Sequence, residues 1–136
     1  MRVLIVKLSS LGDVIQTMPV IEDMKACLPG VTIDWVVEEA FADLVTQAQG
    51  LNRVIPCAER RWRKSPFKRE TRLEWATFWQ TLREVSYDAV IDFQGLIKSA
   101  RIARGASLNA GGFTATFANK SDLCACLLYT SDAADE

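Results

Sequence analysis

The 136-residue chain contains no histidine, and its four cysteines are scattered along it. Histidine and closely paired cysteines supply most zinc and dithiol sites, so both absences argue against a metal centre. Cys124 and Cys126 are too close together for C-x-x-C chemistry. Scattered cysteines are also more typical of an intracellular protein than of a disulfide-rich secreted one. We therefore expect no metal, no cofactor and a cytoplasmic location.

Long hydrophobic runs are missing as well. The first apolar run, Val3 to Val6, is cut short by Lys7, whereas a membrane span needs about 20 apolar residues. No signal peptide is recognisable. We expect at most peripheral contact with a membrane surface.

Neither sign of charge is in clear excess. The chain has 16 basic and 17 acidic side chains, for a formal net charge of −1. Such a chain neither attracts nor repels polyanions strongly, so any anion must be bound by a local cluster. We expect no nucleic-acid partner.

Short apolar runs alternate with helical patterns. The β-branched run at 3–6 predicts a buried strand, and a polar turn with one glycine follows it. Val14, Met18, Ile21 and Leu28 then recur at helical spacing, with a kink expected at Pro19. Repetition of this cycle predicts the α/β class, a Rossmann-like parallel sheet with helices on both faces. The other expected elements are strands at 32–37, 53–55 (ended by Pro56) and 88–93, helices at 38–48 and 75–85, a weak strand signal at 112–117, and no helix beyond about Gly105.

Parallel sheets bind ligands beyond the carboxyl ends of their strands. Three segments should lie there: Lys7 to Asp13, a basic loop from Glu59 to Arg69, and Gln94 to Lys98. The first is not a Walker or dinucleotide-binding loop, because it holds one glycine only. Asp13 has two interpretations: it caps a helix, or it acts as a general base toward an attacking hydroxyl.

The basic loop also has two interpretations. It can be a solvated charged surface, or it can lie against a phosphorylated amphiphile or nucleic acid, because Trp62, Pro66 and Phe67 are interleaved with the cations. A small patch on a neutral domain favours phosphates on a defined substrate over a long polyanion. In the third segment Lys98 can reach a phosphate, although Asp92 and Gln94 can equally form a simple capped turn. The six cations of the basic loop are Arg60, Arg61, Arg63, Lys64, Lys68 and Arg69.

Taken together, four segments resemble a known family, the lipopolysaccharide heptosyltransferases of type I in glycosyltransferase family 9. The resemblance is good over residues 1–103 and looser over 104–125. It implies the N-terminal half of a GT-B glycosyltransferase, in which one Rossmann-like domain binds the acceptor and a second binds ADP-heptose. The segments read MRVLIVKLSSLGDV, DWVVEE, RVIPCAERRWRK and YDAVIDFQGLIKSA.

The resemblance implies an enzyme that transfers heptose from ADP-heptose to a Kdo residue of the lipopolysaccharide inner core, with inversion and without a metal. It implies a Kdo-lipid A acceptor and peripheral contact with the cytoplasmic face of the inner membrane. Asp13 matches the family's catalytic base. The acceptor-binding positions implied are Ser10, Gly12, Arg60, Arg61, Arg63, Lys64, Gln94 and Lys98.

The second domain of the family has no counterpart in this sequence, so the chain alone is expected to be inactive. Residues 126–136 (CLLYTSDAADE) do not resemble the family, and one reverse translation of them matches a transposase-end sequencing adapter. We therefore predict an acceptor-binding domain at 1–125 and a non-native tail at 126–136. Two alternatives stay open: a small module that binds a nucleotide or phosphate, and a non-functional gene fragment.

Overall fold

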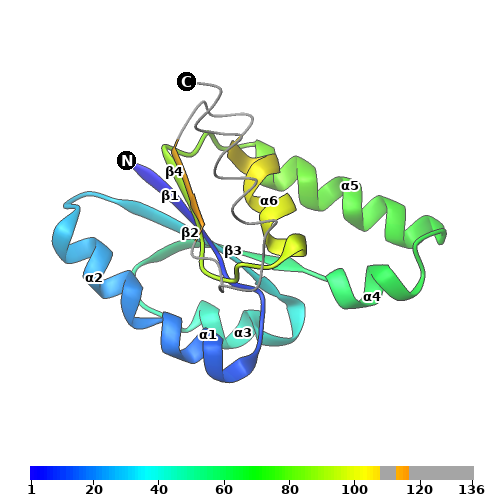
Figure 1. Cartoon of the computed structure of the whole chain (residues 1–136), viewed down its shortest axis with the longest axis horizontal. Helices are drawn as coiled ribbons and strands as arrows, with labels where there is room; N and C mark the ends of the chain where they lie inside the picture. The colour runs from blue at the N-terminus through cyan, green and yellow to red at the C-terminus, as the bar shows by residue number, and fades with distance from the viewer. Residues whose placement is uncertain (108–112, 117–136) are drawn as a thin grey trace.

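A computed structural model describes residues 1–107 and 113–116. The described residues form one five-stranded parallel sheet with strand order β3-β2-β1-β4-β5 (Figure 1). This confirms the predicted α/β class. The strands are β1 (Arg2–Val6), β2 (Thr32–Glu38), β3 (Leu51–Cys57), β4 (Ala89–Asp92) and β5 (Phe113–Thr116).

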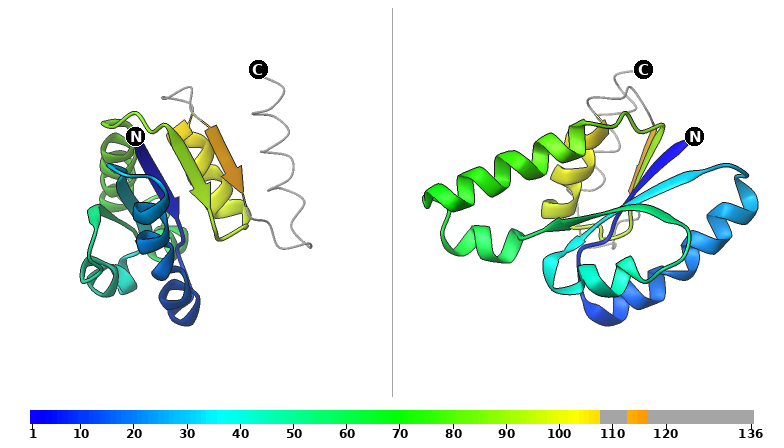
Figure 2. Two further views of the ribbon diagram at one scale, coloured as in Figure 1. Left: turned by 90° about the vertical axis from the view of Figure 1, so that its left-hand side faces the viewer. Right: turned by 180° about the vertical axis from the view of Figure 1, so that it is seen from behind.

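Helices cover both faces of this sheet, as Figures 1 and 2 show. The first face carries the helices that connect β1 to β3, and the second face carries those that follow β3. None of the helices in the described part of the chain is long and apolar enough to cross a membrane. The first set is α1 (Leu11–Thr17), α2 (Pro19–Cys27), η1 (Glu39–Phe41) and α3 (Ala42–Thr46), and the second is α4 (Glu59–Lys64), α5 (Arg69–Arg83) and α6 (Ile97–Ser107).

Strand β1 separates two hydrophobic cores. Because side chains alternate along a strand, Leu4 and Val6 join the core under α4, α5 and α6, whereas Val3 and Ile5 join the core under α1, α2 and α3. All four are at most 1% exposed. Burying each such side chain stabilises the fold by about 1.5–3 kcal/mol, so β1 is the strand on which both layers depend.

The direction of strand addition reverses at β1. The chain builds outward from β1 to β2 and β3, then returns to pair β4 with the other edge of β1. The loops after β1 and β4 therefore lie next to each other at the carboxyl edge of the sheet. This reversal point is where open parallel sheets bind ligands.

Two proline predictions have different outcomes. The expected kink at Pro19 is confirmed, because the helix divides there and Pro19 begins α2. The expected break at Pro56 is wrong, since Pro56 lies inside β3 and pairs with Val37. β3 is the edge strand of the sheet, where a missing N–H costs no ladder hydrogen bond if it faces outward.

Other boundaries also differ from the sequence prediction. The expected helix over 38–48 is wrong at its start, because Glu38 ends β2 and a 3₁₀ turn precedes α3. Leu28 shares its helical spacing with the buried Val14 and Ile21, but it is 37% exposed. The prediction of a loop over 59–69 is wrong at 59–64, where the chain forms α4. The expected end of regular helix near Gly105 is two residues early, because α6 runs to Ser107. The strand signal at 112–117 is confirmed as β5, and the predicted tail at 126–136 lies outside the described residues.

A buried polar cluster ties β2, β3 and the segment before β4 together. Asp34 is 1% exposed and accepts hydrogen bonds from the Asn52 amide, the Arg53 guanidinium and the Tyr87 hydroxyl. Burial and the hydrogen bond to Asp34 raise the pKa of Tyr87, so its phenol stays protonated and donates. Arg53 also pairs at 3.7 Å with the exposed Glu84.

Asp34 and Glu84 both pair with Arg53, but their replacement should reduce the stability of the fold by different amounts. Asp34→Ala should lower the free energy of unfolding by about 3–5 kcal/mol, because it leaves buried donors unpaired. Glu84→Ala should cost less than about 1 kcal/mol, because that pair is exposed. Urea unfolding monitored by tryptophan fluorescence checks both, and Asp34→Asn supplies a milder variant if the alanine does not fold. Equal losses for the two sites would contradict this account.

Replacement of Gly105 and of Gly12 by alanine should change the stability of the fold in opposite directions. A Cβ at Gly105 of α6 would lie 2.1 Å from Trp79 Cζ3 of α5, whereas a Cβ at Gly12 would meet nothing within 4 Å. Gly105→Ala should therefore destabilise by about 1–3 kcal/mol through overpacking. Gly12→Ala should stabilise α1 by up to about 1 kcal/mol. Thermal unfolding measures both, and a stabilising Gly105→Ala would show that α5 and α6 do not pack this closely.

Candidate functional site

The loops after β1 and β4 are joined at the reversal point. The side-chain oxygen Oε1 of Gln94 accepts hydrogen bonds from the backbone N–H groups of Leu8 and Ser9, each at 3.2 Å. The Lys7 ammonium donates to the carbonyl of Phe93 at 3.3 Å. These contacts join the two loops, so the position of the first loop depends on the loop after β4.

Asp92 fixes the turn that carries Gln94. Its fully buried carboxylate accepts from the N–H groups of Gln94 (2.9 Å) and Gly95 (3.2 Å) and from the hydroxyl of Ser99 (3.0 Å). Burial raises the pKa of Asp92, while these donors act in the opposite direction. Gly95 has φ +69°, which favours glycine. Asp92 is thus a cap for the turn, as the simpler interpretation of this segment expected.

Asp13 lies in the first turn of α1 and is exposed. The hydroxyl of Ser10 donates to Asp13 Oδ2 at 3.3 Å. Neither side chain caps a backbone N–H group of α1, so the geometry gives the capping interpretation no hydrogen bond. Within residues 1–107, Asp13 forms no ion pair. Its carboxylate faces solvent at the carboxyl edge of the sheet.

Helix α4 carries four of the predicted acceptor-binding cations. Its N-terminus is capped from β2, because the buried carboxylate of Glu38 accepts a hydrogen bond from the Arg60 N–H at 3.2 Å. Burial raises the pKa of Glu38, and the nearby charge of Lys98 acts against that shift. Sequence reasoning missed Glu38 as a functional position, although its place as the last residue of a strand was the available signal.

Arg61 is held by acidic side chains and does not project freely. Its guanidinium pairs with Glu39 at 3.1 Å and with Glu74 on α5. The Trp62 indole N–H donates to the same Glu74 carboxylate at 3.0 Å. Hydrogen bonds from Arg61 and Trp62 lower the pKa of Glu74 to about 2. Arg61 therefore links α4 to η1 and α5. No ion pair within residues 1–107 involves Arg60 or Lys64.

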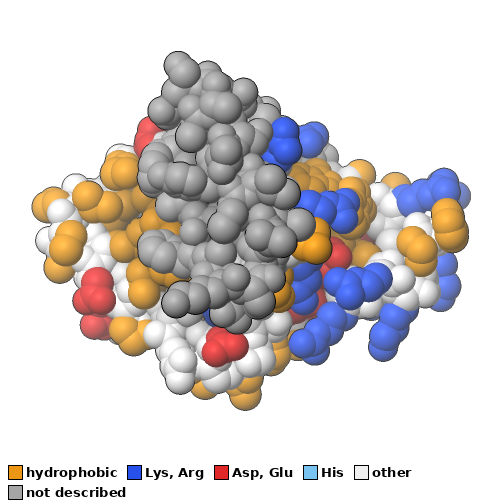
Figure 3. All heavy atoms as spheres, viewed as in Figure 1, with side chains coloured by type: hydrophobic (Ala, Val, Ile, Leu, Met, Phe, Trp, Pro, Cys, Tyr) orange, Lys and Arg blue, Asp and Glu red, His pale blue; other side chains and the backbone are white. Residues whose placement is uncertain are grey.

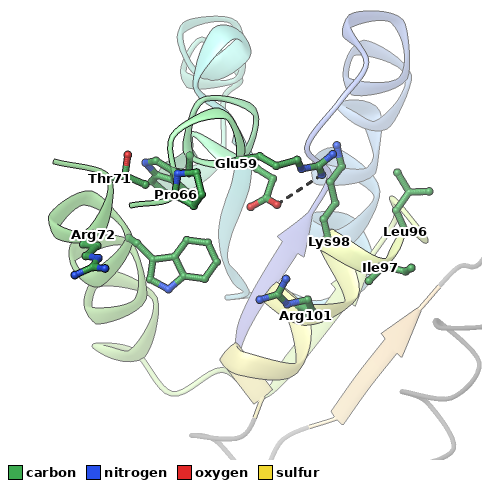
Figure 4. Close-up of a pocket in the computed structure, with 11 residues that line it drawn as sticks. Glu59, Pro66, Thr71, Arg72, Leu96, Ile97, Lys98 and Arg101 are labelled. Atoms are coloured by element: carbon green, nitrogen blue, oxygen red, sulfur yellow. Dashed lines mark ion pairs between the residues drawn. The ribbon is translucent and has the colours of Figure 1, made fainter. Parts of the chain in front are cut away.

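A groove of about 880 Å³ opens between α4, α5 and the start of α6 (Figure 4). Two of the predicted residues, Arg63 and Lys98, lie together in it. Arg63 pairs with Glu59 at 3.7 Å, the dashed line in Figure 4. The groove is lined by Glu59, Trp62, Arg63, Pro66, Thr71, Arg72, Trp75, Leu96, Ile97, Lys98 and Arg101.

The predicted site residues share one edge but not one face of the sheet. Ser10, Gly12 and Asp13 belong to the layer of α1, and the cations belong to the layer of α4 and α6. All of them follow the carboxyl ends of parallel strands. They therefore reach this edge from the two faces of the sheet, and Gln94 joins the loops after β1 and β4.

Other reactive groups offer little in this region. Burial raises the pKa of the Cys57 thiol to about 12, so it is not a thiolate nucleophile at neutral pH. Within residues 1–107 and 113–116, no three His, Cys, Asp or Glu side chains are grouped to hold a metal ion. The chemistry available at the edge is that of a carboxylate, hydroxyls and cations.

Comparisons with known proteins identify the family of the chain. The sequence profile described as Glycosyltransferase family 9 (heptosyltransferase) matches residues 75–131. That match extends into 126–136, so the interpretation of this segment as a non-native tail stays a prediction. Lipopolysaccharide heptosyltransferase 1 of Pseudomonas aeruginosa is 53% identical over 104 residues, covering 76% of this chain and 29% of that protein. The Escherichia coli K12 protein of the same name is 50% identical over 109 residues, covering 77% and 34%.

Solved structures give the same result. The chain is similar to E. coli heptosyltransferase WaaC with ADP, with TM-score 0.85 and 43% identity over 95% of this chain and 40% of that one. E. coli ADP-heptose lps heptosyltransferase II shares the fold at TM-score 0.67 and 20% identity, covering 96% of this chain and 34% of that one. The chain spans about a third of the length of the curated relatives it matches. On sequence and fold together, the chain belongs to glycosyltransferase family 9, the heptosyltransferases.

Proposed function

We propose that this chain is the acceptor-binding half of an inverting heptosyltransferase. The reaction moves heptose from ADP-heptose to a hydroxyl of Kdo in the lipopolysaccharide inner core. The observation that carries the proposal is the joining of the Asp13 loop to the β4 loop at the reversal point, in a chain about 50% identical to lipopolysaccharide heptosyltransferase 1. An exposed carboxylate at this reversal point suits an acceptor hydroxyl that must lose its proton.

Asp13 is the proposed general base. The acceptor oxygen forms a bond to the anomeric carbon of heptose while the bond from that carbon to the ADP phosphate oxygen breaks. The hydroxyl proton passes to Asp13, and ADP carries the bonding electrons away. Attack from the side opposite ADP inverts the anomeric carbon, which needs the base and the leaving group on opposite sides of the sugar. Ser10 holds the Asp13 carboxylate by the hydrogen bond at 3.3 Å.

The cations of α4 and α6 are proposed to bind the acidic groups of the acceptor. Arg60, Arg63, Lys64 and Lys98 supply charge for Kdo carboxylates or lipid-linked phosphates, and guanidinium forks favour such oxyanions. Arg61 contributes by holding α4 in place, since its guanidinium is paired with Glu39 and Glu74. Gln94 positions the first loop, and Gly12, at the start of α1, is proposed to lie beside the acceptor.

ADP-heptose is proposed to bind in a second domain, outside this sequence. Positioning of the donor and stabilisation of the leaving diphosphate supply much of the rate of such a transfer. This chain alone is therefore proposed to be inactive. The enzyme would work in the cytoplasm, in peripheral contact with the inner membrane that holds its acceptor.

The role of Asp13 is testable in a chimera that joins residues 1–103 of this chain to the remainder of the E. coli K12 relative. Asp13→Asn should lower kcat for heptose transfer by about 10²–10⁴-fold, because the hydroxyl loses its proton acceptor. The KM for ADP-heptose should stay within twofold. Product formation from ADP-heptose and a Kdo-lipid acceptor is measured by mass spectrometry.

Asp23→Asn is the matched control, because Asp23 is an exposed carboxylate on α2. It should leave kcat unchanged. Near-normal turnover of a folded Asp13→Asn chimera would remove Asp13 from the mechanism.

Replacement of Arg60 should affect acceptor binding, whereas replacement of Arg61 should affect the stability of the fold. Arg60→Ala should raise the KM for the acceptor about tenfold with an unchanged melting temperature, because within the described residues its guanidinium has no ion-pair partner. Arg61→Ala should lower the melting temperature of the chain, because it releases Glu39 and Glu74. Steady-state kinetics of the chimera and thermal unfolding separate the two, and identical behaviour of both variants would refute the division of roles.

A further inference from the structure

We infer that Glu38 is a positioning residue for the proposed transfer, because it fixes the start of α4 and with it the direction in which the cations of that helix point. The inference rests on the proposed function, since it concerns cations proposed to bind the acceptor. No step of the proposed reaction uses Glu38 itself. Its carboxylate is buried at the end of β2, so it acts through Arg60 and the rest of α4.

Glu38 is a buried carboxylate without an ion pair. It is 3% exposed, and the ion pairs within residues 1–107 do not include it. An isolated carboxylate is costly to bury, so it needs donors that satisfy its oxygens. The N–H of Arg60 donates to Glu38 Oε1 at 3.2 Å. Burial raises the pKa of Glu38, while this hydrogen bond and the charge of Lys98 act in the opposite direction.

Helix α4 lacks a cap of its own. It has six residues, and its N-cap residue is Ala58, whose side chain has no acceptor. The first N–H groups of a helix have no partner within the helix, and isolated helices shorter than about 12 residues are marginal in water. Glu38 supplies from β2 the acceptor that Ala58 lacks. The start of α4 therefore depends on a side chain about 20 residues earlier in the sequence.

Glu38 also links α4 to the loop that leads to Asp13. Its own N–H donates to the carbonyl of Leu8 at 3.1 Å, and the N–H of Leu8 donates to Gln94. A continuous series of hydrogen bonds therefore runs from the loop after β4, through the loop after β1 and the end of β2, to Arg60. The position of the α4 cations relative to the first loop is set by this series.

The cations that depend on Glu38 are not fixed by salt bridges. Figure 3 shows Lys and Arg side chains gathered on the side of the molecule that α4, α5 and α6 occupy in Figure 1. Among the described residues, Arg60 and Lys64 have no ion-pair partner. Arg61 and the buried Trp62 hold the body of α4. Loss of the Glu38 carboxylate should therefore release the first turn of α4 without detaching the helix.

A purely electrostatic role for Glu38 predicts the opposite effect. A carboxylate beside an anion-binding cluster repels the anion, so its removal would strengthen acceptor binding. A positioning role predicts weaker acceptor binding when the hydrogen bond to Arg60 is lost. Glutamine separates the two roles, because its amide oxygen still accepts a hydrogen bond but carries no charge.

The kinetic test uses the chimera of residues 1–103 with the remainder of the E. coli K12 relative. Glu38→Ala should raise the KM for the Kdo-lipid acceptor at least tenfold, with kcat and the KM for ADP-heptose within twofold. Glu38→Gln should keep the acceptor KM within threefold of the parent. A lower acceptor KM in both variants would show that Glu38 acts through charge alone, and an unchanged acceptor KM in Glu38→Ala would show a merely structural role. Either result would overturn the inference.

Asp34→Asn is the matched control, because Asp34 is also a buried carboxylate of β2. Its hydrogen-bond partners lie on β3 and before β4, not on α4. It should lower the melting temperature and leave the acceptor KM unchanged, whereas a rise equal to that of Glu38→Ala would make general loss of stability the cause. An unchanged acceptor KM in Arg60→Ala would contradict the proposed function. An impaired Arg60→Ala beside a normal Glu38→Ala would contradict this inference alone.

Amide hydrogen exchange of Arg60 in the 136-residue chain tests the contact itself. The amide should be protected in the native chain and in Glu38→Gln, and it should exchange at least tenfold faster in Glu38→Ala. The amide of Trp62, which donates to the carbonyl of Ala58, should keep its protection in all three. An unprotected Arg60 amide in the native chain would refute the inference even if Glu38→Ala does not fold.

Discussion

The hydrogen bonds from Leu8 and Ser9 to the side chain of Gln94 are the contacts on which the candidate site depends. They join two loops that are about 85 residues apart in sequence, at the point where the sheet reverses its direction of growth. Asp92 fixes the turn that carries Gln94, and β1 carries the loop that ends in α1. The position of Asp13 at the reversal point therefore depends on both hydrophobic cores, because β1 and β4 are held between them.

The same layering explains the division of the site. Helix α1 brings a carboxylate to the edge from one face, whereas α4 and α6 bring cations from the other. Acidic residues at the ends of strands and helices then decide what each cation can do. Glu38 caps α4, and Glu39 with Glu74 occupies Arg61. On α4, Arg60 and Lys64 have no ion-pair partner among the described residues, so their charge stays available for a ligand.

Much of this fold could be predicted from the sequence, because β-branched runs and helical spacing reflect burial directly. The run at 3–6 predicted β1, and the pattern from Trp75 to Leu82 predicted the buried face of α5. Errors arose where tertiary position overrides local preference. Pro56 is tolerated in β3 because that strand is at the edge of the sheet. Gly105 lies within α6 because Trp79 packs so closely there that a side chain would not fit. The partners of Arg61 could not be predicted, since Glu39 and Glu74 reach it only after α4 docks against η1 and α5. The assignment of catalytic and acceptor-binding roles rests on resemblance and on placement at the carboxyl edge of the sheet.

Amide hydrogen exchange at Leu8 and Ser9, measured by NMR on the 136-residue chain, tests the central claim most directly. The account predicts that both amides are protected in the native chain. In Gln94→Ala they should exchange at least tenfold faster, while the amide of Ile5 in the middle of β1 keeps its protection. Unprotected amides at Leu8 and Ser9 in the native chain, or unchanged protection in Gln94→Ala, would contradict the account.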